Sequence, residues 1–392
     1  MNIHILNTAI QDFINSNLKS DITKLILKGS PFKNISSQEI AEQIEAKNRC
    51  EKKLPKWFST KNIYYPNKLN IEQTSSEITA KYKANLVSGN SLIDITGGFG
   101  VDTYYFSQKV QNVTHCEINE ELSKIVTYNL NQLNSKKIET QIGDGLNYLE
   151  NSTKIFDWIY VDPSRRNNEK GKVFLLEDCL PNIPKNLNLL FNKTDNILIK
   201  ISPILDITSA INELKFVKEI HIVAVGNEVK ELLFILEKNY NQTIHIQTVN
   251  FNKLETQSFD YNLNEEFNAT YSEPKRYLFE PNAAILKAGA FLQISEKLTV
   301  NKLHKHSHLY TSDNLINFPG RSFEIKHLIS YDKKQLKKLI PSKKANITTR
   351  NFPENVAQIR KKTGLKDGGN QYVLFTTDCN NQHIVLICEK IK

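Results

Sequence analysis

The sequence of 392 residues has no apolar run that could cross a membrane, since strand-like runs such as VLFTT and HIVAV span only a few residues. Its N-terminus lacks the basic start, apolar core and small-residue cleavage site of a secretory signal. We therefore expect a cytoplasmic protein with reduced thiols, without disulfides or a cysteine zinc site. Cysteines are few, scattered and never spaced as CxxC: Cys50, Cys116, Cys179, Cys379 and Cys388.

A clustered set of metal ligands is also lacking. His304, His306 and His308 alternate, so a strand would place all three imidazoles on one face, where they could bind zinc. No fourth ligand or acidic residue lies nearby in the sequence. We therefore expect no metal.

Negative charge is in short supply in the last third of the chain. Residues 271–392 hold 21 Lys and Arg against 10 Asp and Glu, whereas residues 1–270 hold 30 against 32. The net charge of +9 therefore resides in the C-terminal part. Such a segregated basic module favours a polyanionic partner, nucleic acid first, although a solvated lysine-rich surface is the alternative.

Residues 1–60 have a helical pattern, with a capping box at Ser36 and Glu39 before an apolar stripe. From about residue 70, short β-branched runs alternate with segments of helical character, which predicts a mostly parallel sheet covered by helices on both faces. The predicted strands are SLIDIT, NVTHCEI, IETQIG, FDWIYVDP, NILIKIS, EIHIVAVG and TIHIQTVNF. Residues 321–392 predict a small α+β unit.

The strongest motif is LIDITGGFGVD, where a buried strand ends at Asp94 and a glycine-rich turn opens a helix. Glycines let backbone N–H groups approach a ligand closely. Acidic residues follow the next strands in turn, and carboxyl ends of strands are where open α/β sheets bind ligands. The predicted cofactor-binding residues are Asp94, Thr96, Gly97, Gly98, Gly100, Glu117, Asp144 and Asp162.

Chemistry favours S-adenosylmethionine over a dinucleotide at this turn. A dinucleotide site normally reads GxGxxG, so that the helix N-terminus holds the pyrophosphate. Asp94 would repel a pyrophosphate but suits the amino group of a methionine moiety. Glu117 suits the two ribose hydroxyls, and Asp144 suits the adenine amino group.

These motifs resemble motifs I to IV of class I methyltransferases, whose sheet has seven strands. More narrowly, the chain resembles bacterial class I methyltransferases with a C-terminal THUMP-like domain over about residues 40–392. The resemblance implies a helical region at 1–70, a Rossmann-like catalytic domain at 71–270, a ferredoxin-like insert at 277–320 and a THUMP-like domain at 321–392. It is carried by EQTSSEITAKYKA, LIDITGGFGVD, VDPSRRN, YLFEPNAAILKAGAF and residues 320–369.

The residues after the fourth strand bear on the acceptor. Amine methyltransferases commonly read N/D-P-P-Y there, whereas this chain reads Asp162, Pro163, Ser164, Arg165, Arg166. We expect Asp162, Pro163 and Arg165 to be catalytic and Arg166 to bind substrate. The alternative, that both arginines are solvated residues of a loop, stays equally open. The turn KISP after the next strand lacks the cysteine that uracil-C5 methylation requires, which argues against that reaction.

The basic tail is the predicted RNA surface. Lysines on one face of KKQLKKLI and basic residues farther along suit phosphate contacts. The sequence thus predicts a methyltransferase acting on tRNA or rRNA. A non-catalytic RNA-binding protein, or a methyltransferase for a small molecule or a protein, stays open, as does the oligomeric state. The RNA-binding candidates besides Arg166 are Lys333, Lys334, Lys337, Lys338, Arg350, Arg360 and Lys361.

Overall fold

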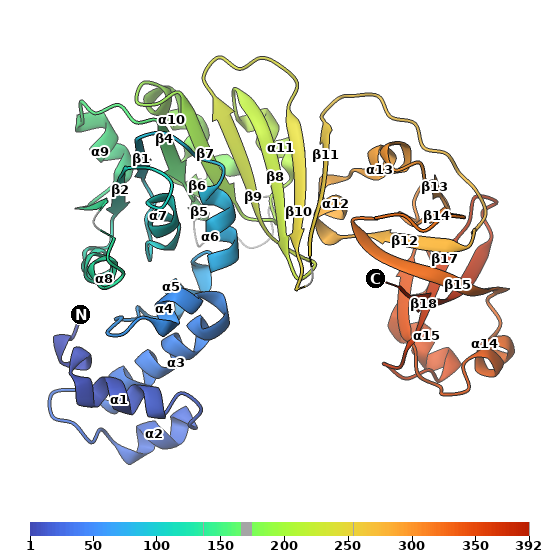
Figure 1. Ribbon diagram of the computed structural model, residues 1–392, viewed down its shortest axis with the longest axis horizontal. Coiled ribbons are helices and arrows are strands. Elements are labelled where there is room, and N and C mark those ends of the chain that lie inside the picture. The colour runs from blue at the N-terminus through green and yellow to red at the C-terminus, as the bar shows by residue number, and fades with distance from the viewer. Residues whose placement is uncertain (136, 166–174, 254, 392) are drawn as a thin grey trace. The chain divides into compact units, whose positions relative to one another are not determined.

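The structure is a computed structural model that describes residues 1–135, 137–165, 175–253 and 255–391 (Figure 1). Contacts divide the chain into two compact units. The first comprises Met1–Lys218 and Leu233–Asn241, and the second comprises Glu219–Leu232 and Gln242–Lys392. None of the helices among the described residues is long and apolar enough to span a membrane.

The first unit begins with a helical region. The predicted capping box is present, because the Glu39 backbone N donates to Ser36 Oγ and the Ser36 backbone N donates to Glu39 Oε2. Ile5, Ile10, Ile40 and Ile44 pack into a small apolar core beneath these helices. The elements are η1 (Ile3–Leu6), α1 (Thr8–Ser16), α2 (Ile22–Lys28), α3 (Ser37–Lys53), α4 (Pro55–Ser59), α5 (Lys68–Gln73) and α6 (Glu77–Ala84).

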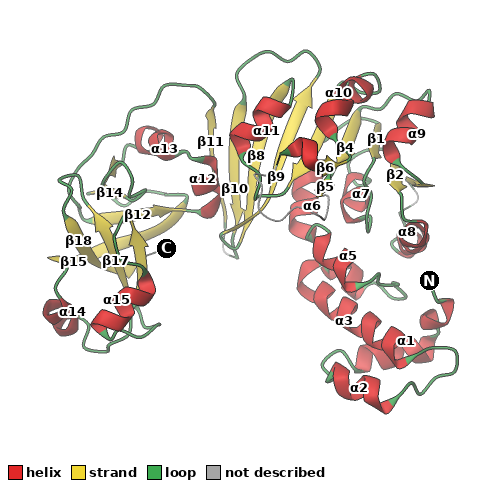
Figure 2. Cartoon of the chain, turned by 180° about the vertical axis from the view of Figure 1, so that it is seen from behind, coloured by secondary structure: helices red, strands yellow, loops and turns green. Residues whose placement is uncertain are grey.

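A nine-stranded sheet follows, in the order β11-β10-β8-β9-β7-β4-β1-β2-β3 (Figures 1 and 2). Strands β1 and β2, β2 and β3, β1 and β4, and β4 and β7 pair in parallel, so their carboxyl ends share one edge. Helices α7, α8 and α9 pack against β2. The bounds are β1 (Ser91–Asp94), α7 (Val101–Phe106), β2 (Asn112–Glu117), α8 (Glu120–Gln132), β3 (Ile138–Ile142), α9 (Gly145–Asn151), β4 (Trp158–Val161), α10 (Ile183–Phe191), β7 (Asn196–Ile201), α11 (Ile207–Glu213), β8 (Val217–Val225), β9 (Glu228–Glu237), β10 (His245–Phe251) and β11 (Thr256–Asn262).

The α/β methyltransferase-like fold class is confirmed, but the strand list was incomplete. Strand β9 was not predicted, because EVKELLFILE lacks strict alternation and lies buried on both faces over Glu231–Leu236. Gly226 and Asn227, both with positive φ, form the two-residue turn between β8 and β9. The predicted seventh strand is β10, which is the eighth strand of this sheet in chain order. Cys179 begins β6 (Cys179–Leu180), which follows η2 (Leu176–Asp178) and pairs with β5 (Ser164–Arg165).

The second unit also contains a seven-stranded, mostly antiparallel sheet of order β13-β14-β12-β15-β18-β17-β16. The α+β character predicted for residues 321–392 is confirmed. Leu336, Ile359 and Phe375 belong to the core that the helices form with this sheet. The elements are β12 (Tyr277–Pro281), α12 (Ala283–Ala288), α13 (Phe291–Lys297), β13 (Asn301–Lys302), β14 (Tyr310–Ser312), β15 (Gly320–Ser330), α14 (Lys333–Leu339), β16 (Asn346–Arg350), α15 (Val356–Thr363), β17 (Gln371–Thr377) and β18 (His383–Lys390).

The three alternating histidines do not lie on a strand. They lie between β13 and β14, where His304 hydrogen-bonds to Asn381 and Asn351 and His308 stacks on Phe291. Within the part of the chain that the structure describes, no group of His, Cys, Asp or Glu could hold a metal ion.

Candidate functional site

The glycine turn after β1 is tied to the end of β2 by two backbone donors. The Gly97 N–H donates to the Cys116 carbonyl at 2.8 Å, and the Gly98 N–H donates to Glu117 Oε2 at 2.9 Å. Asn119 N–H donates to the other Glu117 oxygen at 2.7 Å. Two strand ends thus form one rigid corner at the carboxyl edge of the sheet.

Each glycine in this turn has its own steric reason. A Cβ on Gly97 would lie 2.2 Å from His115 Nε2, and a Cβ on Gly100 would lie 2.8 Å from Val126. Gly100 also has φ +74°, in the left-handed region. The inner side of the turn is therefore full. A Cβ on Gly98, by contrast, would meet nothing nearer than 3.8 Å, so the outer side is open.

Asp94 faces inward, beneath the turn. Its residue is only 1% exposed, Oδ1 accepts from the Thr96 N–H at 3.0 Å, and Oδ2 accepts from Thr103 Oγ1 at 2.7 Å. Burial, opposed by these hydrogen bonds, raises the pKa of Asp94 to about 7. The carboxyl group therefore holds the turn against α7 from within.

Asp144 lies at the next strand end. It is exposed and caps α9, with Oδ1 accepting from Leu146 N–H at 2.8 Å and Asn147 N–H at 3.0 Å. Gly143 before it has φ +136° and open space where a Cβ would be. Glu117 thus ends β2 and Asp144 follows β3, and these two strands pair in parallel at this edge.

Asp162 follows β4 and forms an ion pair with Lys200 Nζ from β7. The Asp162 N–H donates to Thr96 Oγ1 at 2.7 Å, which connects this strand end to the glycine turn. The Asp162 side chain is 33% exposed and that of Lys200 is 13% exposed. The fourth strand end therefore presents a carboxylate and an ammonium together.

A buried ionic cluster behind the turn was not predicted from the sequence. Lys83 from α6 is fully buried, 3.1 Å from Asp102 Oδ1 and 2.8 Å from Ser75 Oγ. Asp102 Oδ2 accepts from Ser75 Oγ and from the Tyr160 hydroxyl, each at 2.8 Å. Burial alone would raise the pKa of Asp102, but Lys83, Lys200 and the two hydroxyls outweigh it and hold the pKa below its usual value.

No sequence pattern singles out Lys83. Lys81, two residues earlier on α6, has a side chain that is 57% exposed, whereas Lys83 faces the core of the domain. Ser76, and not Ser75, caps α6, which leaves Ser75 for the buried cluster. Ser75 lies in the segment EQTSSEITAKYKA, which resembles the methyltransferase family. That resemblance was the one sign in the sequence that Ser75 belongs to the site.

Of the two arginines predicted to act on the substrate, the structure describes only Arg165. Arg165 is on β5, where its backbone pairs with Cys179. Arg166 lies outside the described residues.

Comparison with solved structures decides the family. Over 99% of this chain and 98% of the other, the fold matches the crystal structure of a Porphyromonas gingivalis W83 protein assigned as a methyltransferase, with 30% identity and a TM-score of 0.87. The chain belongs to this methyltransferase family. Its members have the class I fold with C-terminal ferredoxin-like and THUMP-like parts, and class I methyltransferases use S-adenosylmethionine.

Family models match three segments of this methyltransferase. Residues 320–390 match a model described as THUMP domain-like, and residues 277–319 match one described as a ferredoxin-like domain. Residues 21–167 match the protein-L-isoaspartate(D-aspartate) O-methyltransferase model. No curated protein matches the chain.

Two further solved structures match part of the chain. An rRNA methylase from Streptococcus thermophilus is 16% identical, over 41% of this chain and 94% of its own, with a TM-score of 0.30. TrmK from M. capricolum, bound to S-adenosyl-homocysteine, is 18% identical, over 41% of this chain and 68% of its own, with a TM-score of 0.30. TM-scores this low carry no weight for function.

Six exposed lysines of the methyltransferase lie on two neighbouring helices, α14 and α15 (Figure 2). On α14 the buried Leu336 faces the core, which turns the lysines outward. The exposed lysines on these helices are Lys333, Lys334, Lys337, Lys338, Lys361 and Lys362.

Two predicted RNA-binding arginines serve the fold of the methyltransferase. Arg360 donates to Asp367 at 2.5 Å and to the Ala345 carbonyl at 3.2 Å. Arg350 pairs at 3.0 Å with Glu280, a buried carboxylate that also pairs with Arg321. Both guanidiniums therefore already have strong partners within the unit.

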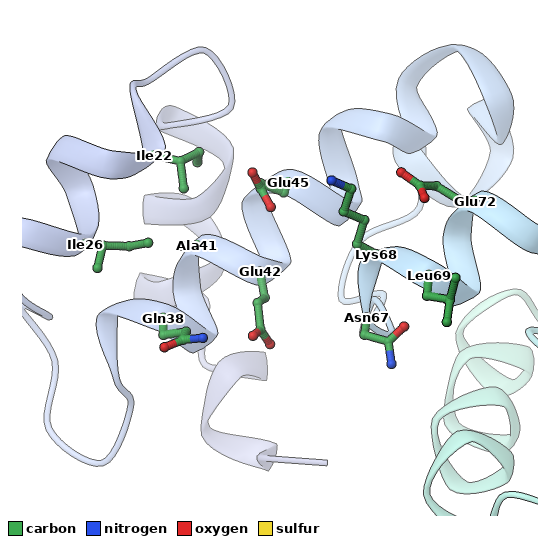
Figure 3. A pocket seen from close by; sticks show the side chains of 10 residues that line it. All are labelled: Ile22, Ile26, Gln38, Ala41, Glu42, Glu45, Asn67, Lys68, Leu69 and Glu72. Atoms are coloured by element: carbon green, nitrogen blue, oxygen red, sulfur yellow. The ribbon is translucent and has the colours of Figure 1, made fainter.

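An open groove of about 500 Å³ lies among the N-terminal helices (Figure 3). Ile22 and Ile26 lie at one end of it, Leu69 and Glu72 at the other, and Glu42 between them. None of the lining residues follows a strand of the sheet, so this groove is separate from the candidate site.

Proposed function

We propose that this methyltransferase binds S-adenosylmethionine at the carboxyl edge of its sheet and transfers the methyl group to RNA held by α14 and α15. The open outer side of the glycine turn, framed by Glu117 and Asp144, supports this most directly. The same proposal divides the chain into a helical region at 1–70, a catalytic domain at 71–270, a ferredoxin-like insert at 277–320 and a THUMP-like domain at 321–392.

The residues present fit this cofactor. Gly98 leaves open space next to the Glu117 carboxylate, where a ribose could approach. Asp144 is exposed at the neighbouring strand end, in reach of an adenine. Asp94 supports the cofactor site indirectly, because both of its carboxylate oxygens accept hydrogen bonds that hold the glycine turn in place. When bound, S-adenosylmethionine supplies a methyl group already activated on a sulfonium, so the chain chiefly has to orient the acceptor.

Calorimetry with S-adenosylhomocysteine tests the cofactor site. We expect Glu117→Ala to weaken binding at least tenfold, since a carboxylate that could bind two hydroxyls is lost. Glu139→Ala is the matched control, because Glu139 is an exposed glutamate on the adjacent strand β3. Equal affinity of Glu117→Ala and the control would refute the site.

RNA is the proposed acceptor because of the charge on α14 and α15. Four exposed lysines on α14 can each neutralise a phosphate, and each such contact adds about one unit to the slope of log affinity against log salt. Changing Lys333, Lys334, Lys337 and Lys338 to Gln should therefore weaken binding to structured RNA and flatten this slope by up to about four units.

The matched control carries the same charge change elsewhere. In this control, four exposed lysines of the N-terminal helical region are changed to Gln, namely Lys19, Lys24, Lys28 and Lys33. RNA binding should remain unchanged. Equal loss of affinity in both quadruple variants would reject α14 as the docking surface.

A protein acceptor is the second candidate, favoured by the match of residues 21–167 to the isoaspartate methyltransferase model. That match contains the glycine turn and the first four strand ends, which are the cofactor half of the site. Labelling a cell extract with radioactive S-adenosylmethionine, followed by nuclease or protease treatment, separates the two. Nuclease-sensitive label supports RNA, and protease-sensitive label supports protein.

A further inference from the structure

The acceptor side of the site carries a lysine that the proposed function does not yet use. Lys200 ends β7 and Asp162 follows β4, two strands that pair in parallel and are neighbours in the sheet. The two side chains form an ion pair, and both are partly exposed at the carboxyl edge. An acceptor at this edge therefore meets an ammonium as well as a carboxylate.

The charges around Lys200 show that its ammonium belongs to the site. It interacts favourably with the buried Asp102 carboxylate as well as with Asp162. Lys83 already compensates Asp102 at 3.1 Å, and Asp94 is a carboxyl whose pKa lies near neutrality. Lys200 thus balances Asp162 as Lys83 balances Asp102, and its charge is left uncompensated once Asp162 takes up a proton.

This charge discriminates between nucleophiles. A neutral amine becomes cationic as it attacks a methyl group, and a nearby ammonium opposes that change. An acceptor that attacks as an anion becomes neutral, and the same ammonium stabilises its charged form. Two unit charges about 4 Å apart near a protein surface change an equilibrium about a thousandfold, which is enough to decide the acceptor.

We infer that the ion pair of Lys200 and Asp162 selects an RNA acceptor that gives up a proton and attacks as an anion, such as a ribose hydroxyl or a ring imide. This rests on the proposed function. Once Asp162 carries the proton, the ammonium of Lys200 disfavours an exocyclic amine, which becomes cationic as it attacks. The sequence agrees, since Ser164 and Arg165 replace the second proline and the tyrosine of N/D-P-P-Y.

The step balances with the groups at hand. The acceptor O–H or N–H gives its proton to the Asp162 carboxylate while Lys200 faces the developing anion. The acceptor electron pair forms the bond to the methyl carbon, and the electron pair of the broken carbon–sulfur bond stays on the departing thioether. Solvent then takes the proton from Asp162, which restores the ion pair.

Mass spectrometry of nucleosides tests the inference directly. The full chain is incubated with total RNA and S-adenosylmethionine bearing a deuterated methyl group, and the RNA is digested to nucleosides. Deuterium in ribose-methylated nucleosides, or in N1-methylguanosine or N3-methyluridine, supports the inference and distinguishes its two sources. Deuterium in N6-methyladenosine, N2-methylguanosine or N4-methylcytidine overturns it while the proposed function stands. Unlabelled RNA overturns both.

Variants of Lys200 give a second readout. We expect Lys200→Met to lower kcat at least a hundredfold and to shift the rise of the rate with pH upward by at least one pH unit. Lys200→Arg should restore the pH profile, because it keeps the charge. The affinity for S-adenosylhomocysteine should change less than twofold in both variants.

Lys218→Met is the matched control, since Lys218 forms an ion pair with Glu237 at the amino end of β8. Its pH profile should equal that of the wild type. Equal pH profiles of Lys200→Met and the wild type would refute the role of Lys200. Tryptophan fluorescence in urea reports whether Lys200→Met is folded, and if it is not, Lys200→Arg and the nucleoside analysis decide.

Discussion

Replacing Gly97 by alanine tests whether the glycine turn is fixed by its contact with His115. The added Cβ would lie 2.2, 2.4 and 2.6 Å from three atoms of the His115 ring, which is fully buried. The buried ring has no contact with water, and this burial lowers the pKa of His115 to about 4. The ring is therefore neutral. Because neither side can give way, we expect a loss of about 1–3 kcal/mol, as for other overpacked cores.

Urea unfolding followed by tryptophan fluorescence measures this loss in the first unit, because both tryptophans, Trp57 and Trp158, belong to it. The double variant Gly97→Ala with His115→Ala removes the ring that clashes. Its loss should be smaller than the sum of the two single losses by more than about 0.5 kcal/mol. Additive losses, or an unchanged midpoint for Gly97→Ala, would refute the steric argument.

Three further outcomes follow from buried charges. Lys83→Met should cost about 3–5 kcal/mol in urea, because Asp102 stays buried without its partner, and Asp102→Asn in the same chain should recover part of the loss. Burial raises the pKa of Asp94 above its unfolded value, so the stability contributed by its protonated form is complete below about pH 4 and is lost as the pH rises through about 7. The wild type should therefore lose stability from about pH 4 to about pH 7 relative to Asp94→Asn, and equal pH dependence would contradict this. Glu280→Ala should speed amide hydrogen exchange in β12 and β15, because two arginines lose a shared partner, whereas Glu324→Ala, an exposed pair, should not.

Much of the cofactor half could be predicted because its signals are local. A strand end, a glycine turn and the acid after the next strand are adjacent in sequence or separated by one helix, as at Asp94 and Glu117. Parallel pairing then brings these ends to one edge. The predicted contacts of these acids with the cofactor remain predictions.

The parts that escaped prediction depend on tertiary contacts. Lys83 and Asp102 meet only because α6 packs on α7, and helical periodicity does not distinguish Lys83 from the exposed Lys81. Arg350 lies in a basic stretch of the sequence, yet it forms an ion pair with Glu280, which is 70 residues away. Basic clustering in the sequence could not show that such a cation already has a partner within the fold.

Strand β9 imposes an order on assembly of the sheet. It lies between β7 and β8 in space but follows both along the chain. Until residues 228–237 are available, one edge of β7 has no strand beside it, and its apolar face stays open to other chains. A fragment ending before residue 228 would contain the glycine turn and all four acidic strand ends, yet it would tend to aggregate instead of yielding an isolated cofactor domain.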